Sequence, residues 1–227
     1  MKQIRIWMRA TLLWTTLGTA SAQHFEDYFE DRTLRIDYTF SGNSEKQALY
    51  VDELVALPRW YGKRERLAEV PLKGNGQITV TDKAEGKVIF RHSFSTLFQE
   101  WLATEESKRT PRSFENTFLI PFPKKPVDIT VELTDYHQKV TAQMTHSIDP
   151  KDILIRKAGE QLVTPYMILQ QAADTTRCIH VAYVAEGYRQ DEMDTFIKDC
   201  KIAMDALFSH EPFKQMQDRF NMIDVRS

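Results

Sequence analysis

The sequence is poor in cysteine, with only Cys178 and Cys200 among 227 residues. Small secreted proteins with weak cores are held together by several disulfides, so this chain is not built on a disulfide framework. The sequence leaves open whether the two cysteines pair. Each falls on an apolar face, where a free cysteine behaves as a small hydrophobe, so we expect unpaired, buried thiols.

Long apolar runs and an excess of positive charge are also missing. Nothing approaches the roughly 20 apolar residues that a membrane-spanning helix needs, so we expect no membrane anchor. The 30 basic and 32 acidic residues give a net charge of −2, which does not favour nucleic acid as a partner. Two basic runs, residues 63–66 and 108–112, have no interleaved aromatic residues, and we interpret them as solvated loop charges.

The first 22 residues have the three parts of an export signal. Lys2, Arg5 and Arg9 precede a short apolar run, and the small residues of Ala20-Ser21-Ala22 suit a signal peptidase. We therefore predict a signal peptide over residues 1–22, cleavage before Gln23, and a periplasmic or secreted mature protein. The mature chain would carry a net charge of −5, because three positive charges are removed.

Residues 23–149 are dominated by alternation of apolar and polar side chains, which is typical of strands with one buried face. The pattern is clearest over residues 34–40 and 127–133, and residues 77–81 and 87–94 read as a hairpin whose loop ends at Gly86. Prolines in residues 121–126 punctuate two further strands. The sequence therefore predicts an N-terminal antiparallel β-sandwich.

One helical segment interrupts this pattern. Leu97, Phe98, Trp101 and Leu102 recur at helical spacing after a possible cap at Ser95, which predicts a short helix across one end of the sandwich. Exposed aromatic residues of a sugar-binding module are an alternative reading of Trp60, Tyr61 and Trp101. We favour packing residues, because aromatic side chains dominate small β cores.

The pattern changes after residue 149. We interpret residues 150–175 as a connection with one weak strand at residues 153–155. Residues 178–185 are almost continuously apolar, which predicts a strand buried on both faces. A helix follows with a single apolar stripe, and residues 220–225 supply another strand, so residues 176–227 read as an incomplete α/β (βαβ) unit, the start of a larger domain.

Several separated segments then point to a known family. Residues 184–188, 192–200, 207–213 and 219–221 resemble the start of the catalytic domain of the IgA peptidase family of zinc metallopeptidases. Residues 72–77, 95–101 and 113–118 resemble the amino-terminal β domain of that family. The resemblance implies an exported peptidase that acts on protein or glycoprotein substrates with a catalytic zinc ion.

The family's zinc-binding motif, His-Glu-x-x-His, has no counterpart in this chain. The six histidines include no pair four residues apart, and His210-Glu211 is followed by Pro212 with Lys214 in the second histidine's place. We therefore assign no catalytic, cofactor-binding or metal-binding residue, and we expect no zinc in this chain. The segment Glu186-Gly187-Tyr188 could line a substrate cleft, but a strand-to-helix turn is the simpler interpretation.

Two functions from different classes follow. The chain is either the non-catalytic N-terminal portion of an exported zinc metallopeptidase, or a stand-alone exported module that binds glycans or host proteins. Coding sequence for the missing motif downstream of Ser227 would favour the first. A stable monomer that binds a glycan or a host protein would favour the second.

Overall fold

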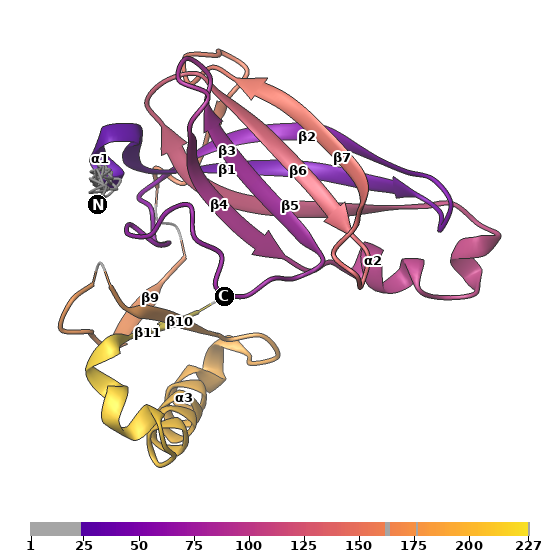
Figure 1. The fold of residues 1–227 in the computed structure, drawn as a ribbon. Coiled ribbons are helices and arrows are strands. Elements are labelled where there is room, and N and C mark those ends of the chain that lie inside the picture. The colour runs from indigo at the N-terminus through magenta and orange to yellow at the C-terminus, as the bar shows by residue number, and fades with distance from the viewer. Residues whose placement is uncertain (1–23, 162–163, 176, 227) are drawn as a thin grey trace, which may run out of the picture.

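The structure is a computed structural model that describes residues 24–161, 164–175 and 177–226. The predicted signal peptide lies outside these residues. The chain forms a β domain followed by a smaller part built on a separate sheet (Figure 1). This agrees with the mixed, β-rich fold predicted from the sequence.

The β domain consists of two four-stranded sheets. The first has the strand order β5-β1-β2-β8 and the second β4-β3-β6-β7. The bounds are β1 Phe29–Gly42, β2 Gln47–Pro58, β3 Gly76–Asp82, β4 Val88–Phe94, β5 Arg112–Pro123, β6 Val127–Thr134, β7 Val140–Ile148 and β8 Arg156–Lys157. All neighbours are antiparallel except β2 and β8, and a four-residue helix, α1 (Phe25–Tyr28), precedes β1.

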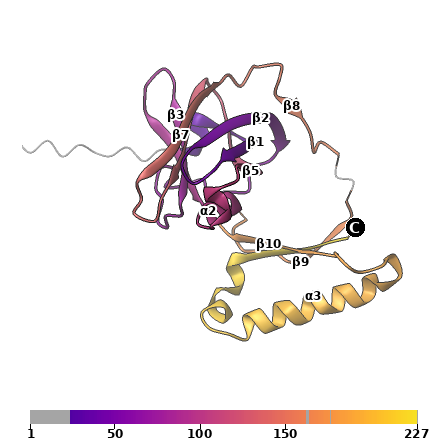
Figure 2. The same ribbon diagram turned by 90° about the vertical axis from the view of Figure 1, so that its right-hand side faces the viewer.

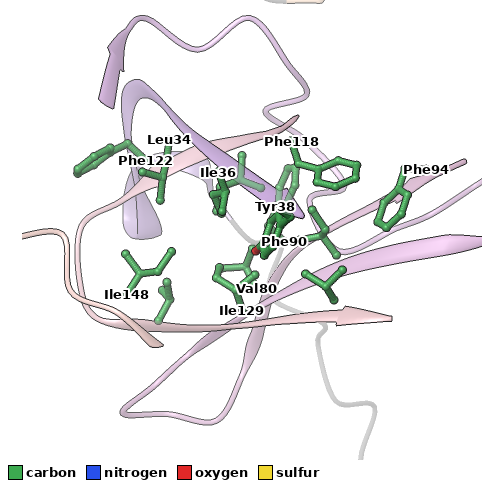
Figure 3. Packing of buried hydrophobic residues seen from close by; sticks show 14 of the residues in the cluster. Leu34, Ile36, Tyr38, Val80, Phe90, Phe94, Phe118, Phe122, Ile129 and Ile148 are labelled. Atoms are coloured by element: carbon green, nitrogen blue, oxygen red, sulfur yellow. The ribbon is translucent and has the colours of Figure 1, made fainter. Parts of the chain in front are cut away.

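The alternating side chains of both sheets meet in one hydrophobic core (Figure 3). Along β1 the residues Leu34, Ile36, Tyr38 and Phe40 are fully buried, and β6 buries its apolar residues in the same alternating way. The predicted hairpin is β3 and β4, and Gly86 in its loop has a φ of +65°, which glycine adopts without a Cβ clash. The period-two pattern thus located this core correctly.

A short helix, α2 (Leu97–Leu102), closes one end of the two sheets, followed by a 3₁₀ turn, η1 (Glu106–Lys108). Phe98 is fully buried and its ring lies 6.2 Å from that of Phe40. The helix was predicted, but its cap is Thr96 and not Ser95: the Thr96 hydroxyl accepts a hydrogen bond from the Gln99 amide.

Two details of the β domain differ from the sequence predictions. Strand β5 continues through Pro121 to Pro123 instead of ending before the prolines, which is possible because β5 is an edge strand. The charge run at residues 63–66 is not simply solvated. Lys63 and Arg64 are half-buried, and the Arg64 guanidinium lies 4.7 Å from the centre of the Phe25 ring.

The third sheet has the strand order β10-β11-β9, with β9 at Tyr166–Gln170, β10 at Ile179–Val184 and β11 at Phe220–Val225. Strands β10 and β11 are parallel, and β9 is antiparallel to β11. The 3₁₀ turn η2 (Gln190–Glu192) leads into α3 (Met193–Phe208), and η3 (Phe213–Arg219) leads into β11. Helix α3 covers the face of this sheet that points away from the β domain (Figure 2).

The apolar stripe predicted for this helix is correct, since Met193, Phe196, Cys200 and Phe208 are all buried. Other predictions for this part are wrong. Residues 153–155, predicted as a weak strand, form a turn in which Ile153 is 95% exposed. Strand β10 is not buried on both faces but lies at the edge of its sheet, and Val184 is 60% exposed.

The residues that the structure describes include no helix with the length and hydropathy of a membrane span.

Candidate functional site

A cleft of about 750 Å³ lies between the β domain and the third sheet. This volume falls in the range of typical ligand sites. The β domain contributes Asp31, Arg59, Trp60, Tyr61, Gly62 and Arg64, and the other wall consists of Thr164, Tyr166, Ile168, Gln171, Thr175, His180, Val181, Ala182, Asn221, Ile223 and Val225.

The wall from the β domain is polar and firmly held. Trp60 is buried, its amide donates to Asp31 Oδ1 at 3.1 Å, and its indole Nε1 donates to the Lys63 carbonyl at 3.0 Å. The Asp31 carboxylate also pairs with Arg64. Burial works to raise the pKa of Asp31, but the hydrogen bonds from Trp60 and Arg64 and the charge of Arg64 outweigh it, so the pKa is lowered. Asp31 therefore acts as an ionised anchor for this wall.

The opposite wall is the bare face of the third sheet, and it is largely apolar. Ile168 is 55% exposed, while Ile223 and Val225 are half-buried on the central strand β11. The other face packs on α3 through residues such as Met222 and Phe220, which are buried. A three-stranded sheet with one helix leaves its second face apolar and open, which makes this wall suited to an apolar ligand segment.

Two side-chain contacts cross from one wall to the other. The rings of Tyr61 and His180 lie 5.4 Å apart at an interplanar angle of 76°, an edge-to-face arrangement. Arg177 and Glu65 form an ion pair with an Nη2–Oε2 distance of 3.1 Å. Both contacts join the loop after β2 to the start of β10.

His180 also contacts two side chains of its own part. Its Nε2 lies 3.5 Å from Cys178 Sγ, and its Nδ1 lies 3.3 Å from Asn221 Nδ2. A thiol beside an imidazole can act as a nucleophile only if the thiolate is favoured. Burial, together with the negative charge of Asp174, raises the pKa of Cys178 instead. Cys178 therefore remains a protonated thiol at neutral pH and is not an activated nucleophile.

Of the residues singled out from the sequence, Trp60 and Tyr61 line the cleft. Trp60 is buried and Tyr61 is 64% exposed, whereas Trp101 packs against the core of the β domain. The segment Glu186-Gly187-Tyr188 is a strand-to-helix turn: Gly187 has a φ of +85°, and the Tyr188 hydroxyl donates to Asp199 at 2.8 Å. The cleft lining does not include Glu186, Gly187 or Tyr188.

The described residues do not fit a zinc site. Within residues 24–161, 164–175 and 177–226, no three side chains of His, Cys, Asp or Glu gather closely enough to hold a metal ion. A protein zinc site needs three or four such ligands. His210 and Glu211 are exposed after the end of α3. No catalytic step is assigned to metal in this chain.

The sequence reasoning missed His180, Arg177 and Glu65 as contact residues. The spacing of Cys178 and His180 was a usable signal, because residues two apart on a strand point to the same face. The contacts of Tyr61 and Glu65 had no such signal, because they join positions more than 100 residues apart.

The comparisons with known proteins match both parts of the chain. The family model for the Peptidase M64 N-terminus matches residues 24–145, more than half of the chain. The model for IgA Peptidase M64 matches residues 167–227. Among curated proteins, no significant match was found. Both models agree with the segments that resemble this family in the sequence, and the chain belongs to the IgA peptidase M64 family.

Proposed function

We propose that this chain is the non-catalytic N-terminal portion of an exported zinc metallopeptidase, and that it positions a protein or glycoprotein substrate and braces the peptidase part. One observation carries the proposal. The cleft is lined on one side by residues matched to the N-terminal model and on the other mostly by residues matched to the peptidase model, with Thr164 and Tyr166 just before the matched range. A substrate segment in the cleft would touch both.

The chemistry of the two walls suits a polypeptide. The apolar sheet face offers contacts for apolar side chains, and the polar wall offers Tyr61 and Arg59 for backbone carbonyls or carboxylates. The stand-alone module that binds glycans is supported only by Tyr61, since the other two candidate aromatic residues pack in or against the core. Substrate positioning is therefore the better supported function.

Binding of immunoglobulin A, the substrate named in the family description, tests the proposal. Surface plasmon resonance would compare the purified chain with its Ile168→Asp and Ile202→Asp variants. Both isoleucines are exposed, at 55% and 65%, but only Ile168 lines the cleft. We expect binding that Ile168→Asp weakens at least tenfold and Ile202→Asp leaves unchanged. Absence of binding, or equal loss in both variants, would contradict substrate positioning in the cleft.

The same binding assay also tests the alternative function, a glycan-binding module. Binding that disappears when the immunoglobulin is enzymatically deglycosylated, and that Tyr61→Ala removes, would support the glycan-binding module instead. Binding that survives deglycosylation supports polypeptide recognition.

Export is part of the proposal and rests on the three-part pattern of residues 1–22. Mass spectrometry of the protein from the periplasm or culture medium should give a mature chain that begins at Gln23. An intact Met1 on exported protein would contradict it.

Purified alone, the chain should neither bind zinc tightly nor cleave protein, and chelator-sensitive cleavage would show that it is an active peptidase.

A further inference from the structure

Residues 60–66, which we call the platform, are held rigidly on the β domain. The buried Trp60 anchors one end through its two hydrogen bonds to Asp31 and Lys63. Leu67, directly after the platform, is 1% exposed and its carbonyl accepts a hydrogen bond from the Arg91 amide at 3.0 Å. Gly62 lies so close to Trp60 that an added Cβ would come within 2.2 Å of the indole ring. The loop is therefore a fixed surface.

The platform points two exposed side chains at the peptidase part. Tyr61 meets His180 edge to face, and Glu65 pairs with Arg177. His180 is the second residue of β10 and Arg177 lies two residues before the strand, so the two contacts hold one end of the third sheet. Beside them the two parts are separated by the cleft, whose volume of about 750 Å³ shows that the walls do not pack together there.

From this geometry we infer that the platform is the docking surface for the peptidase part and fixes its orientation relative to the β domain. The partner is the start of β10, with the His180 ring and the Arg177 cation as the recognised groups. Since the contacts lie beside the cleft, they also fix the separation of its walls. The inference deepens the bracing role in the proposed function and requires no substrate.

Two contacts of different chemistry make the platform selective for one orientation of the peptidase part. An exposed ion pair contributes little alone and is screened by salt, whereas an edge-to-face ring pair depends on ring position. Loss of one contact would leave the peptidase part held by the other. Loss of both should let its orientation relative to the β domain vary.

The test is a distance measurement between spin labels carried by non-canonical amino acids at Leu72 in the β domain and Ile202 in α3. These residues are 84% and 65% exposed, so the labels should not disturb packing. Pulsed electron paramagnetic resonance on the full chain would compare the parent with Tyr61→Ala, Glu65→Lys and their combination. We expect a narrow distance distribution in the parent and at least a twofold broader one in the combined variant.

Matched controls separate docking from general damage. Tyr136→Ala and Glu45→Lys change an exposed tyrosine and an exposed glutamate away from the cleft and should leave the distribution narrow. Tyr61→Phe keeps the ring and should behave like the parent. In the Tyr61→Ala background, exchange of the charges, Glu65→Lys with Arg177→Glu, should narrow the distribution again relative to Tyr61→Ala with Glu65→Lys alone.

A combined variant with the parent's distribution would overturn the inference, as would broadening by Tyr136→Ala or Glu45→Lys of similar size. Immunoglobulin binding is measured separately, so failure here leaves substrate positioning standing, and failure of binding leaves the docking surface standing. Circular dichroism of each variant would verify that the β domain is folded.

Discussion

Tyr38 and His146 join the two sheets of the β domain through the core. The Tyr38 hydroxyl, fully buried on β1, lies 2.7 Å from His146 Nε2 on β7. Burial raises the pKa of Tyr38, which therefore remains a donor, and burial lowers the pKa of His146, although the charge of Asp128 opposes this. The neutral imidazole accepts the hydrogen bond, and protonation of Nε2 would remove the acceptor.

This pair predicts that the free energy of unfolding decreases as the pH falls below about 6.5, the ordinary histidine pKa. The folded pKa is lowered, so the unfolded chain binds the proton more readily, and there is no effect well above pH 6.5. Each proton that only the unfolded chain binds changes the free energy of unfolding by up to about 1.4 kcal/mol per pH unit. When this free energy is measured by guanidinium unfolding between pH 5 and 8, it should depend less steeply on pH in His146→Gln than in the parent.

His137→Gln, the same substitution at an exposed histidine in the loop between β6 and β7, is the matched control variant. His92 acts in the same direction as His146, because burial and the nearby Lys63 lower its pKa. The slope in His146→Gln should therefore be reduced and not abolished. An unchanged slope would contradict the role of the Tyr38–His146 pair.

The two cysteines are free thiols, as expected, but they are not equally buried. Cys200 is 3% exposed in the core beside α3, whereas Cys178 is half-buried near the cleft, so the prediction of two buried thiols was wrong for Cys178. Burial raises the pKa of both. Because Cys178 is the more exposed thiol, iodoacetamide should modify it at least fivefold faster than Cys200. Both rates should increase towards pH 9, because the thiolate is the reactive form. Peptide mapping by mass spectrometry would measure this, and Cys200 reacting first would contradict it.

At the scale of the elements, α2 depends on the Thr96 cap. The helix has six residues, too few to be stable without its cap and the burial of Phe98. Thr96→Ala should lower the free energy of unfolding by about 1 kcal/mol. Ser95→Ala, one residue away and exposed, should change it by less than about 0.5 kcal/mol, the usual range for surface substitutions. Equal effects in chemical denaturation would show that the cap is not Thr96.

Strands with strict alternation could be predicted from the sequence, and strands whose partners lie far along the chain could not. Leu34 to Phe40 carry the pattern of one buried face in the residues themselves. Strand β9 was missed because Tyr166–Gln170 is almost uniformly apolar and does not alternate. Its pairing with β11, more than 50 residues later, defines it as a strand. The burial of β10 was misjudged for a similar reason, because strand order is not visible in a strand's own residues.

The cleft was beyond sequence reasoning, since its walls come from distant parts of the chain. Asp31 and Arg64 line one side and Ile223 the other, and no local pattern links them. The family resemblance, in contrast, was readable in advance, because several short segments agreed in order along the chain.

At the scale of the whole molecule, the two parts should differ in stability. The β domain has one large shared core, whereas the third sheet has two small clusters and an open apolar face. Limited trypsin digestion should cut first after Lys157 or in the part that follows, leaving a protected fragment of residues 23–157 that keeps β8 in its sheet. Hydrogen exchange of β10 and β11 as slow as that of β1 and β6 would contradict this difference.

The number of residues between the two ends of strand β1 is fixed by contacts at both ends. Near its start, Asp31 holds Trp60 and Arg64 at the cleft, and near its end Phe40 packs on Phe98 at the other end of the sheets. An inserted or deleted residue between them would turn every following side chain to the opposite face. The register shift at Asp37/Tyr38 places Asp52 as an extra residue in β2. Against β5, the shift between Phe29 and Thr33 places extra residues in β1 itself, so the strict spacing of β1 begins after Thr33. Relatives should therefore vary in length at residues 43–46 and keep constant the spacing between Leu34 and Phe40.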